Sequence, residues 1–293
     1  MCIVEARPCV LMIFLLRFLA GAAMSAQTID HGRLARICVS ALVWELAVFS
    51  IYLFNGVMDV HEDRINGSRR PIASGALSAS VAAWVAAGAA VVSLVGAVAI
   101  GKEIVWAVIM LLAFGYFYSG PPAYLKRQPL GSAITGISLV LLTYYAGLAA
   151  YGGGGWTHPG LALPAFVGGA TLWVGLVGAP AKDLSDVAGD VAAGRRTIPA
   201  LYGEAKANRM VAAVALGLAM AFCAVGTRIA PLLLWPGVGM IIGAAAMAVV
   251  CLGGFSQGSR FRRRRPYRVF MTTQYLTHLG ALLGLTAHFL LST

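Results

Sequence analysis

Charged residues are scarce in this sequence, and their scarcity indicates the environment of the chain. Asp, Glu, Lys and Arg make up only 11% of the 293 residues, and 59% of the residues are hydrophobic. Soluble domains carry about 25% charged residues. A soluble fold of this length could not bury so much apolar surface. The composition therefore predicts an integral membrane protein surrounded by the lipid bilayer.

Cysteine is also scarce, and the spacing of the cysteines argues against a metal site built on them. The five cysteines are odd in number, and no two of them have the spacing of metal ligands. We expect them to be small apolar packing residues. The net charge of +11 would suit a nucleic acid. However, the sequence has neither zinc-finger spacing nor the aromatic pattern of RNA-binding domains, so we expect no nucleic-acid partner.

Long apolar segments recur along the whole chain. Each is close to the ~20 residues that a helix needs to cross the hydrocarbon of a bilayer. Strands of a membrane barrel would be about ten residues long and would alternate in polarity. We therefore predict one all-α transmembrane domain over 1–293, a polytopic bundle of about nine helices. The segments are 8–26, 38–58, 80–100, 103–120, 131–151, 160–180, 210–227, 230–254 and 270–291. The first could be mistaken for a signal peptide, but Arg17 interrupts it and many spans follow.

The basic residues predict the orientation of the chain. The loops after the second, fourth, sixth and eighth segments hold 16 of the 22 lysines and arginines. Because such loops stay in the cytoplasm, we expect a cytoplasmic N-terminus. Nine spans put the C-terminus outside, and the alternative of eight spans puts it inside. The arginine run 262–265 is either a topology signal beside anionic lipids or an attractor of anionic substrate.

The acidic residues are concentrated in two short segments. A charge near the bilayer core costs roughly 2.5–3.5 kcal/mol, and clustered like charges also repel. Such clusters are expected where a cation lies between the acids. Both segments come at the cytoplasmic end of a span, the second and the sixth. They contain six of the eleven acidic residues, namely Asp59, Glu62, Asp63, Asp183, Asp186 and Asp190.

Helical spacing places the polar residues of each segment on one side. Asn55, Asp59 and Asp63 are spaced i, i+4 and i+8, so each step drifts only about 40° around a helix. The three aspartates of 183–190 are spaced i, i+3 and i+7. Since both segments end spans on the same side of the membrane, we predict that they face one another across a cavity.

The predicted ligands are all oxygen atoms, which suit Mg²⁺ rather than zinc. Mg²⁺ is usually held by a few carboxylates together with phosphate oxygens. The two segments therefore predict a metal-bridged diphosphate, whose leaving charge the metal would neutralise. Arg and Lys side chains nearby could bind the diphosphate. They are Arg69, Arg70, Lys126, Arg127 and Lys182, of which Arg70 and Lys126 lie beside proline-containing turns.

These segments resemble motifs of the UbiA superfamily of intramembrane prenyltransferases. The stretch from Asn55 through Asp59, Asp63 and Asn66 to Arg70-Pro71-Ile72 and Gly75 resembles the first motif. The segment 183–190, followed by Arg195-Arg196-Thr197-Ile198-Pro199, resembles the second, and Tyr118 to Arg127 resembles the loop after the fourth helix. One departure is Gly56, which stands where many members have Asp. Glu62 is the neighbouring acid that could partly compensate.

The resemblance implies a nine-helix bundle around a central cavity that opens to the bilayer. It implies that a polyprenyl diphosphate binds through Mg²⁺ at the cytoplasmic cap and ionises to an allylic cation, which alkylates a hydrophobic or aromatic acceptor. By this resemblance the metal or diphosphate ligands, and hence the catalytic residues, are Asn55, Asp59, Asp63, Asp183, Asp186 and Asp190. The diphosphate contacts are Arg70, Lys126 and Arg127, to which we add Lys182.

The acceptor is not evident from the sequence, because the spans contain few polar groups. They are Glu45, Thr143, Tyr144, Tyr145, Gln274, His278 and His288. Glu45, Tyr118, Tyr144 and Tyr145 are candidates for the cavity wall, where tyrosine rings could stabilise a cation or merely pack. This scarcity keeps a terpene cyclase of the same superfamily as an alternative. A cation transporter is a distant alternative, because it predicts acids near the midplane and often an inverted repeat, and neither is clear here.

Overall fold

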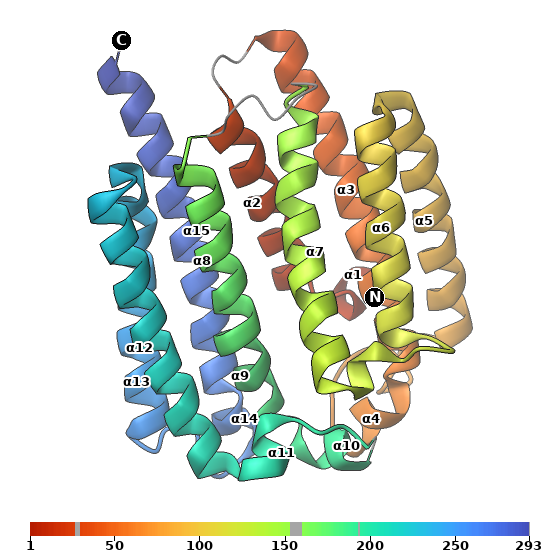
Figure 1. Ribbon diagram of the computed structural model, residues 1–293. Coiled ribbons are helices and arrows are strands. Elements are labelled where there is room, and N and C mark those ends of the chain that lie inside the picture. Colours follow the sequence, from red (N-terminus) through yellow and green to blue (C-terminus); the bar gives the residue numbers. More distant parts are fainter. Residues whose placement is uncertain (27–29, 153–159, 193, 293) are drawn as a thin grey trace. The chain divides into compact units, whose positions relative to one another are not determined.

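A computed structural model describes residues 1–26, 30–152, 160–192 and 194–292. Every regular element within these ranges is a helix, as the sequence predicts (Figure 1). The chain divides into two compact units, Met1–Thr157 and His158–Thr293. Each unit carries one of the two acidic segments. The prediction of a single domain over 1–293, and that of a central cavity, stay predictions.

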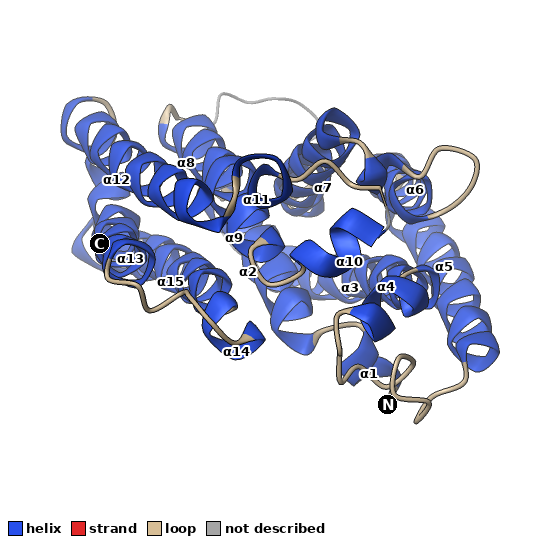
Figure 2. Ribbon diagram, turned by 90° about the horizontal axis from the view of Figure 1, so that it is seen from below, coloured by secondary structure: helices blue, strands red, loops and turns tan. Residues whose placement is uncertain are grey.

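The first unit contains five long helices, of which α3 packs against α5 and α6, and α2 packs against α7. Its short elements α1 and α4 lie at the end where α3 finishes and α5 begins (Figures 1 and 2). The elements are α1 (Cys2–Glu5), α2 (Pro8–Ser25), α3 (His31–Met58), α4 (Val60–Ile65), α5 (Ala79–Ile100), α6 (Lys102–Ser119), η1 (Leu125–Arg127) and α7 (Pro129–Ala150).

Small residues let α2 and α7 approach closely. A Cβ atom on Gly21 would collide with the carbonyl oxygen of Tyr144, and one on Gly147 would collide with the carbonyl oxygen of Phe18. In lipid, where burial of apolar side chains gives little drive, such close backbone contact is a main source of helix association. The glycines therefore determine where these two helices cross.

The second unit begins with a span that is not a regular α-helix. It runs from α8 (Ala162–Leu172) through the π-helical η2 (Trp173–Gly178) into α9 (Ala179–Asp183). Pro180 has no N–H with which to bond the preceding turn, which explains a local departure from α geometry. Gly178 also lacks the Cβ atom that would collide with the ring of Phe270, so this ring packs closely against the backbone. Such π-turns frequently occur near functional sites.

The rest of the second unit consists of three long helices joined by short ones. Helix α13 packs along α15 and α12. Helices α10, α11 and α14 gather at the end of the unit where α9 finishes and α12 begins (Figure 1). The elements are α10 (Val187–Ala192), α11 (Ile198–Tyr202), α12 (Glu204–Arg228), η3 (Pro231–Leu233), α13 (Leu234–Leu252), α14 (Arg260–Arg263) and α15 (Arg265–Ser292).

Within the described residues, eight helices are long and apolar enough to cross a membrane. They are Pro8–Ser25, His31–Met58, Ala79–Ile100, Lys102–Ser119, Leu130–Ala150, Ala162–Asp183, Glu204–Arg228 and Pro231–Leu252. The ninth predicted segment, 270–291, is helical within α15 but is not one of the eight. Gln274 and His278 lower its hydropathy, and both are buried. The side chain of His288 lies outside those that the structure describes.

Candidate active site

The first acidic segment lies at the junction of α3 and α4. The backbone N–H of Asp59 donates to the carbonyl of Asn55 at 2.9 Å, and that of Asp63 donates to the carbonyl of Asp59 at 2.8 Å. The helical hydrogen bonds thus continue through the junction, as the i, i+4 spacing requires. The amide of Asn55 donates to the hydroxyl of Ser119 at 2.9 Å, which links α3 to the end of α6.

Lys126 is the most buried cation of the first unit's acidic end. Its side chain is only 1% exposed, its Nζ atom forms an ion pair with Asp59, and Oδ1 of Asp59 is the acceptor. Glu62 lies 4.0 Å from the same Nζ atom. A buried ammonium is stabilised only when it is paired in this way. The neighbouring Arg127 is exposed, and its guanidinium lies 4.5 Å from the ring centre of Tyr124.

Arg70 bridges two carboxylates with the two arms of its guanidinium. Nη1 lies 2.7 Å from Oδ2 of Asp63, and Nη2 lies 2.8 Å from Oε1 of Glu5. Nη2 also donates to the carbonyl oxygen of Glu5 at 3.0 Å. Glu5 is fully buried, and its other oxygen accepts from the backbone N–H of Ile72 at 2.8 Å. Sequence reasoning missed Glu5, because nothing in its local context marks it as a partner of residues 65 positions away.

The predicted cavity residues of the first unit differ in burial. Tyr144 is buried, whereas Tyr118, Tyr145 and Glu45 are half-buried. Oε1 of Glu45 is buried without a hydrogen-bond partner among the described residues. The hydroxyl of Thr143 donates to the carbonyl of its own helix at Leu139, so it is satisfied locally.

Arg17 is a buried cation to which sequence reasoning assigned no role. It lies within the apolar helix α2 and is only 4% exposed. Its guanidinium lies 5.2 Å from the ring centre of Phe14 and makes a hydrogen bond with the side chain of Tyr144 on α7. A buried cation inside a span is costly unless it has a role or a partner. The signal was present in the sequence as the interruption of the first apolar segment.

The second acidic segment follows the π-turn and ends the span at Asp183. Nζ of Lys182 lies 3.1 Å from Oδ1 of Asp183. Nη2 of Arg260, from α14, lies 3.0 Å from Oδ1 of Asp186. Nη1 of Arg195 lies 3.0 Å from Oδ1 of Asp190. Each aspartate of this segment is thus paired with a cation. Arg260, two residues before the arginine run 262–265, is a partner that the sequence did not single out.

The environments of two aspartates shift their pKa values in opposite directions. Burial raises the pKa of Asp190 to about 6, although Lys182 acts against this shift. Burial also opposes ionisation of Asp186, but the charges of Lys182 and Arg260 outweigh it and hold the pKa of Asp186 below its ordinary value. The low pKa keeps Asp186 ionised at neutral pH and available as a ligand for a cation.

Neither acidic segment by itself forms a complete metal site. Among the described residues, no three His, Cys, Asp or Glu side chains converge on one point. In both segments, however, the carboxylates alternate with Lys or Arg side chains. Oxygen donors without Cys or His suit a hard cation such as Mg²⁺, which commonly takes further oxygen ligands from a phosphate. The residues present therefore fit Mg²⁺ together with a diphosphate.

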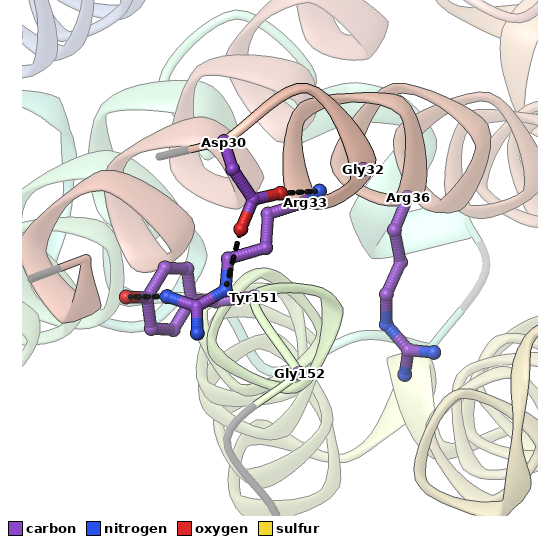
Figure 3. Close-up of a pocket in the computed structure, with 6 residues that line it drawn as sticks. All are labelled: Asp30, Gly32, Arg33, Arg36, Tyr151 and Gly152. Carbon is purple, nitrogen blue, oxygen red and sulfur yellow. Dashed lines mark hydrogen bonds and ion pairs between the residues drawn. The ribbon is translucent and has the colours of Figure 1, made fainter. Parts of the chain in front are cut away.

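A separate pocket of about 360 Å³ lies at the other end of the first unit, where α3 begins and α7 ends (Figure 3). There Arg33 donates to the hydroxyl of Tyr151 at 2.7 Å and lies 3.5 Å from Asp30. Arg36 donates to the carbonyls of Ile100 and Ala150, so it ties the ends of α5 and α7 together. These contacts brace the helix ends, and no predicted site residue lines this pocket.

The family follows from a comparison with protein-family models. The model of the UbiA prenyltransferase family matches residues 14–277, which is most of the chain. The chain belongs to the UbiA prenyltransferase family. The resemblance that the motifs indicate is therefore confirmed, and so is the predicted class of enzyme, a transferase of prenyl groups.

Two curated relatives and two solved structures agree with a UbiA fold. A digeranylgeranylglyceryl phosphate synthase of Methanoculleus marisnigri is 30% identical over 212 residues, covering 70% of this chain and 69% of the relative. One of Methanopyrus kandleri is 29% identical over 216 residues, covering 73% and 74%. A UbiA homologue from Archaeoglobus fulgidus bound to Cd²⁺ has a TM-score of 0.66 at 18% identity, covering 97% of this chain and 98% of its own. Its structure with GPP and Mg²⁺ has a TM-score of 0.63 at 18% identity, covering 97% and 99%.

Proposed function

We propose that this membrane enzyme depends on Mg²⁺ and transfers the prenyl group of an isoprenyl diphosphate to an acceptor within the bilayer. The observation that carries the proposal is the alternation of half-buried carboxylates and cations at the acidic ends of the helices. Asp59 pairs with Lys126, Asp63 pairs with Arg70, and Asp186 on the second unit pairs with Arg260. Carboxylates bind a metal ion, and Lys and Arg side chains bind phosphate oxygens. A metal–diphosphate ligand therefore matches both kinds of side chain.

The residues that would hold Mg²⁺ supply oxygen atoms only. They are Asn55, Asp59 and Asp63 of the first unit and Asp183, Asp186 and Asp190 of the second. When bound, Mg²⁺ supplies charge neutralisation for the departing diphosphate. The Archaeoglobus fulgidus homologue, whose structure holds both GPP and Mg²⁺, supports this assignment by its similar fold.

The cations would hold the diphosphate and stabilise its charge. Lys126 is buried against carboxylates, and Arg70 is fixed by two of them, so both are preorganised. In the reaction, the bond between C1 of the prenyl chain and the diphosphate oxygen breaks, and the electron pair leaves with the diphosphate. The acceptor forms a new bond to C1 and releases a proton. Arg127 and Lys182 are more exposed and would contact the outer phosphate oxygens.

The names of the two curated relatives suggest the class of acceptor. Digeranylgeranylglyceryl phosphate carries two geranylgeranyl groups on one glyceryl phosphate. An enzyme that forms it would add the second group to a hydroxyl of geranylgeranylglyceryl phosphate. We propose an acceptor of this kind, apolar with an anionic head, in preference to an aromatic acid. The buried cation Arg17, in an apolar helix of the first unit, supports an anionic acceptor.

The site is proposed to open to the cytoplasm. Each acidic segment comes at the end of a span that is followed by a loop rich in Lys and Arg. Such loops remain in the cytoplasm. Labelling of introduced cysteines in sealed vesicles would test this orientation. Reagent that cannot cross the membrane should label a cysteine at Gly67 only after the cytoplasmic face is made accessible. Labelling of that position from the outer face of intact cells would contradict it.

The activity is tested with purified protein in detergent. Geranyl, farnesyl and geranylgeranyl diphosphates are each supplied with and without Mg²⁺, combined with geranylgeranylglyceryl phosphate, with 4-hydroxybenzoate or with no acceptor. We expect Mg²⁺-dependent transfer to the glyceryl phosphate. Transfer to hydroxybenzoate alone would overturn the acceptor, and a cyclic hydrocarbon without acceptor would indicate a cyclase. Absence of diphosphate release under every condition would overturn the proposed activity.

A further inference from the structure

The first unit contains a buried carboxylate that belongs to no motif. Glu5 ends the short helix α1 and has no solvent exposure. Its neighbour Ala6 packs in one apolar cluster with Leu53 of α3 and with Ile72. Helix α1 is therefore fixed against α3 by packing, and Glu5 is held at the level of the acidic segment. A carboxylate buried so fully is costly unless it is paired and hydrogen-bonded, so its partners matter.

Gly56 is the position on α3 that admits Glu5. A Cβ atom on Gly56 would collide with Oε1 of Glu5 and would lie 2.6 Å from Nη2 of Arg70. Any side chain at this position would therefore displace the Glu5 carboxylate. In the resemblance to the first UbiA motif, this is the one position where an aspartate is replaced. The carboxylate of Glu5 thus occupies the space beside Gly56, the position that lacks a carboxylate of its own.

Glu5 and Asp63 hold the two arms of one guanidinium. Because Arg70 presents its donors as a rigid fork, fixing Nη2 to Glu5 also fixes the direction of Nη1 toward Asp63. Glu5 further accepts from the N–H of Ile72, so it anchors the turn that follows Arg70. Loss of Glu5 would free Arg70 to rotate, and Asp63 would lose its orientation with it.

The charges of this end of the unit are consistent with a role for Glu5. The ion pairs among its carboxylates and cations join four acids, Glu5, Asp59, Glu62 and Asp63, to two cations, Arg70 and Lys126. Within this set of ion pairs two negative charges are left unbalanced, which matches one divalent cation. Without Glu5 only one would remain, and attraction for a divalent cation would be weaker.

We infer that Glu5 is a positioning residue of the diphosphate site and supplies, from α1, the carboxylate that α3 lacks at Gly56. It holds Arg70 and the turn at Ile72 so that Arg70 and Asp63 can both contact the same metal–diphosphate ligand. This inference rests on the proposed function, because it assigns Glu5 a role in binding the proposed substrate.

The test moves the carboxylate from one element to the other. Three proteins are compared with the wild type: Glu5→Gln, Gly56→Asp, and the double variant Glu5→Ala/Gly56→Asp. Readouts are the Mg²⁺ concentration at half-maximal rate, KM and kcat for the prenyl diphosphate, binding of the Mg²⁺–prenyl diphosphate by calorimetry, and thermal unfolding. Glu103→Gln, at the far end of α6, is the matched control and should leave all of them unchanged.

We expect Glu5→Gln to raise KM and the Mg²⁺ requirement about tenfold, as for loss of a charged hydrogen bond, with a smaller change in kcat. Gly56→Asp alone should be at least as impaired, because its carboxylate meets that of Glu5. The double variant should recover to within about threefold of the wild type.

Three outcomes would overturn the inference. The first is a double variant no better than the worse single variant. The second is a Glu5→Gln protein that loses thermal stability but keeps its KM and Mg²⁺ requirement, since this would show a purely structural role. The third is a wild type that neither binds nor turns over prenyl diphosphate, which would overturn the proposed function as well. Turnover by the wild type with no recovery in the double variant would overturn the role of Glu5 alone.

Discussion

Arg70 lies 2.7 Å from Asp63 on one arm of its guanidinium and 2.8 Å from Glu5 on the other. The three residues come from a turn, from α4 and from α1, so the ion pairs join separate segments of the chain. Because α4, which carries Asp63, follows the end of α3 with only Asp59 between them, the position of Arg70 depends on the end of a transmembrane helix. The first predictions therefore concern the ion pairs at the end of the first unit where α3 finishes.

Lys126→Met should lower kcat/KM for the prenyl diphosphate by about 10²–10³-fold. The substitution removes a buried cation and leaves Asp59 without its partner, and such a loss typically costs 2–5 kcal/mol. Steady-state kinetics with purified protein measures the effect. Lys102→Met, an exposed lysine at the start of α6, is the matched control and should retain its activity. A Lys126→Met protein close to the wild type would contradict a role of Lys126 in binding diphosphate.

Asp59→Ala and Asp186→Ala should each abolish detectable turnover while the protein stays folded. Each removes a proposed metal ligand, one from each unit, and among the described residues no group of three His, Cys, Asp or Glu side chains could hold the metal in its place. Turnover at saturating Mg²⁺ and thermal unfolding in detergent are the measurements. Asp30→Asn, an exposed acid at the opposite end of the first unit, serves as the control. Near-normal activity in either alanine variant would count against the metal site.

Arg260→Ala should raise KM for the prenyl diphosphate by about tenfold, because Arg260 contacts Asp186 and contributes to holding its pKa low. Arg262→Ala removes an exposed arginine from the same short helix, at the start of the arginine run 262–265. If the run serves only as a topology signal, the two variants should behave alike. A larger rise in KM for Arg260→Ala than for Arg262→Ala, with kcat measured alongside, would assign Arg260 to the site.

Gly147→Ala should destabilise the first unit by about 1–3 kcal/mol, as expected for overpacking a tight contact. The added methyl group would collide with the carbonyl oxygen of Phe18 and force α2 away from α7. Gly136→Ala lies on the same helix with open space around its Cβ position, so it should be neutral or slightly stabilising. Thermal unfolding of both variants in one detergent gives the comparison. Equal stabilities would show that the close approach contributes little.

The spans and the acidic segments could be predicted from the sequence because their signals are local. A run of apolar residues is visible in any window, and Asn55, Asp59 and Asp63 show their shared side by spacing alone. The boundaries were less accurate, since α3 begins at His31, with the side chain of Asp30 accepting from Arg33, rather than at 38.

The partners of the site residues could not be predicted, because they come from distant positions. Nothing near Glu5 indicates that it will meet Arg70, and Arg260 is one of several similar arginines. The sequence showed that Gly56 lacks a carboxylate and offered Glu62 as compensation. The structure instead places Glu5 against Gly56, while Glu62 lies 4.0 Å from Lys126. Arg17 was visible in the sequence only as a break in an apolar segment.

The π-helical turn at Trp173–Gly178 changes how the sixth span should be compared with other proteins. A π-turn accommodates one residue more than the α-helix around it, which rotates everything beyond it by about 100°. A helical wheel drawn through the whole span would therefore point Asp183 toward the wrong side. Deleting a single residue from this turn would restore regular geometry and redirect the aspartates that follow. Relatives that differ in length by one residue here would thus differ in the direction in which the aspartates of the second motif point, even where every aspartate is retained.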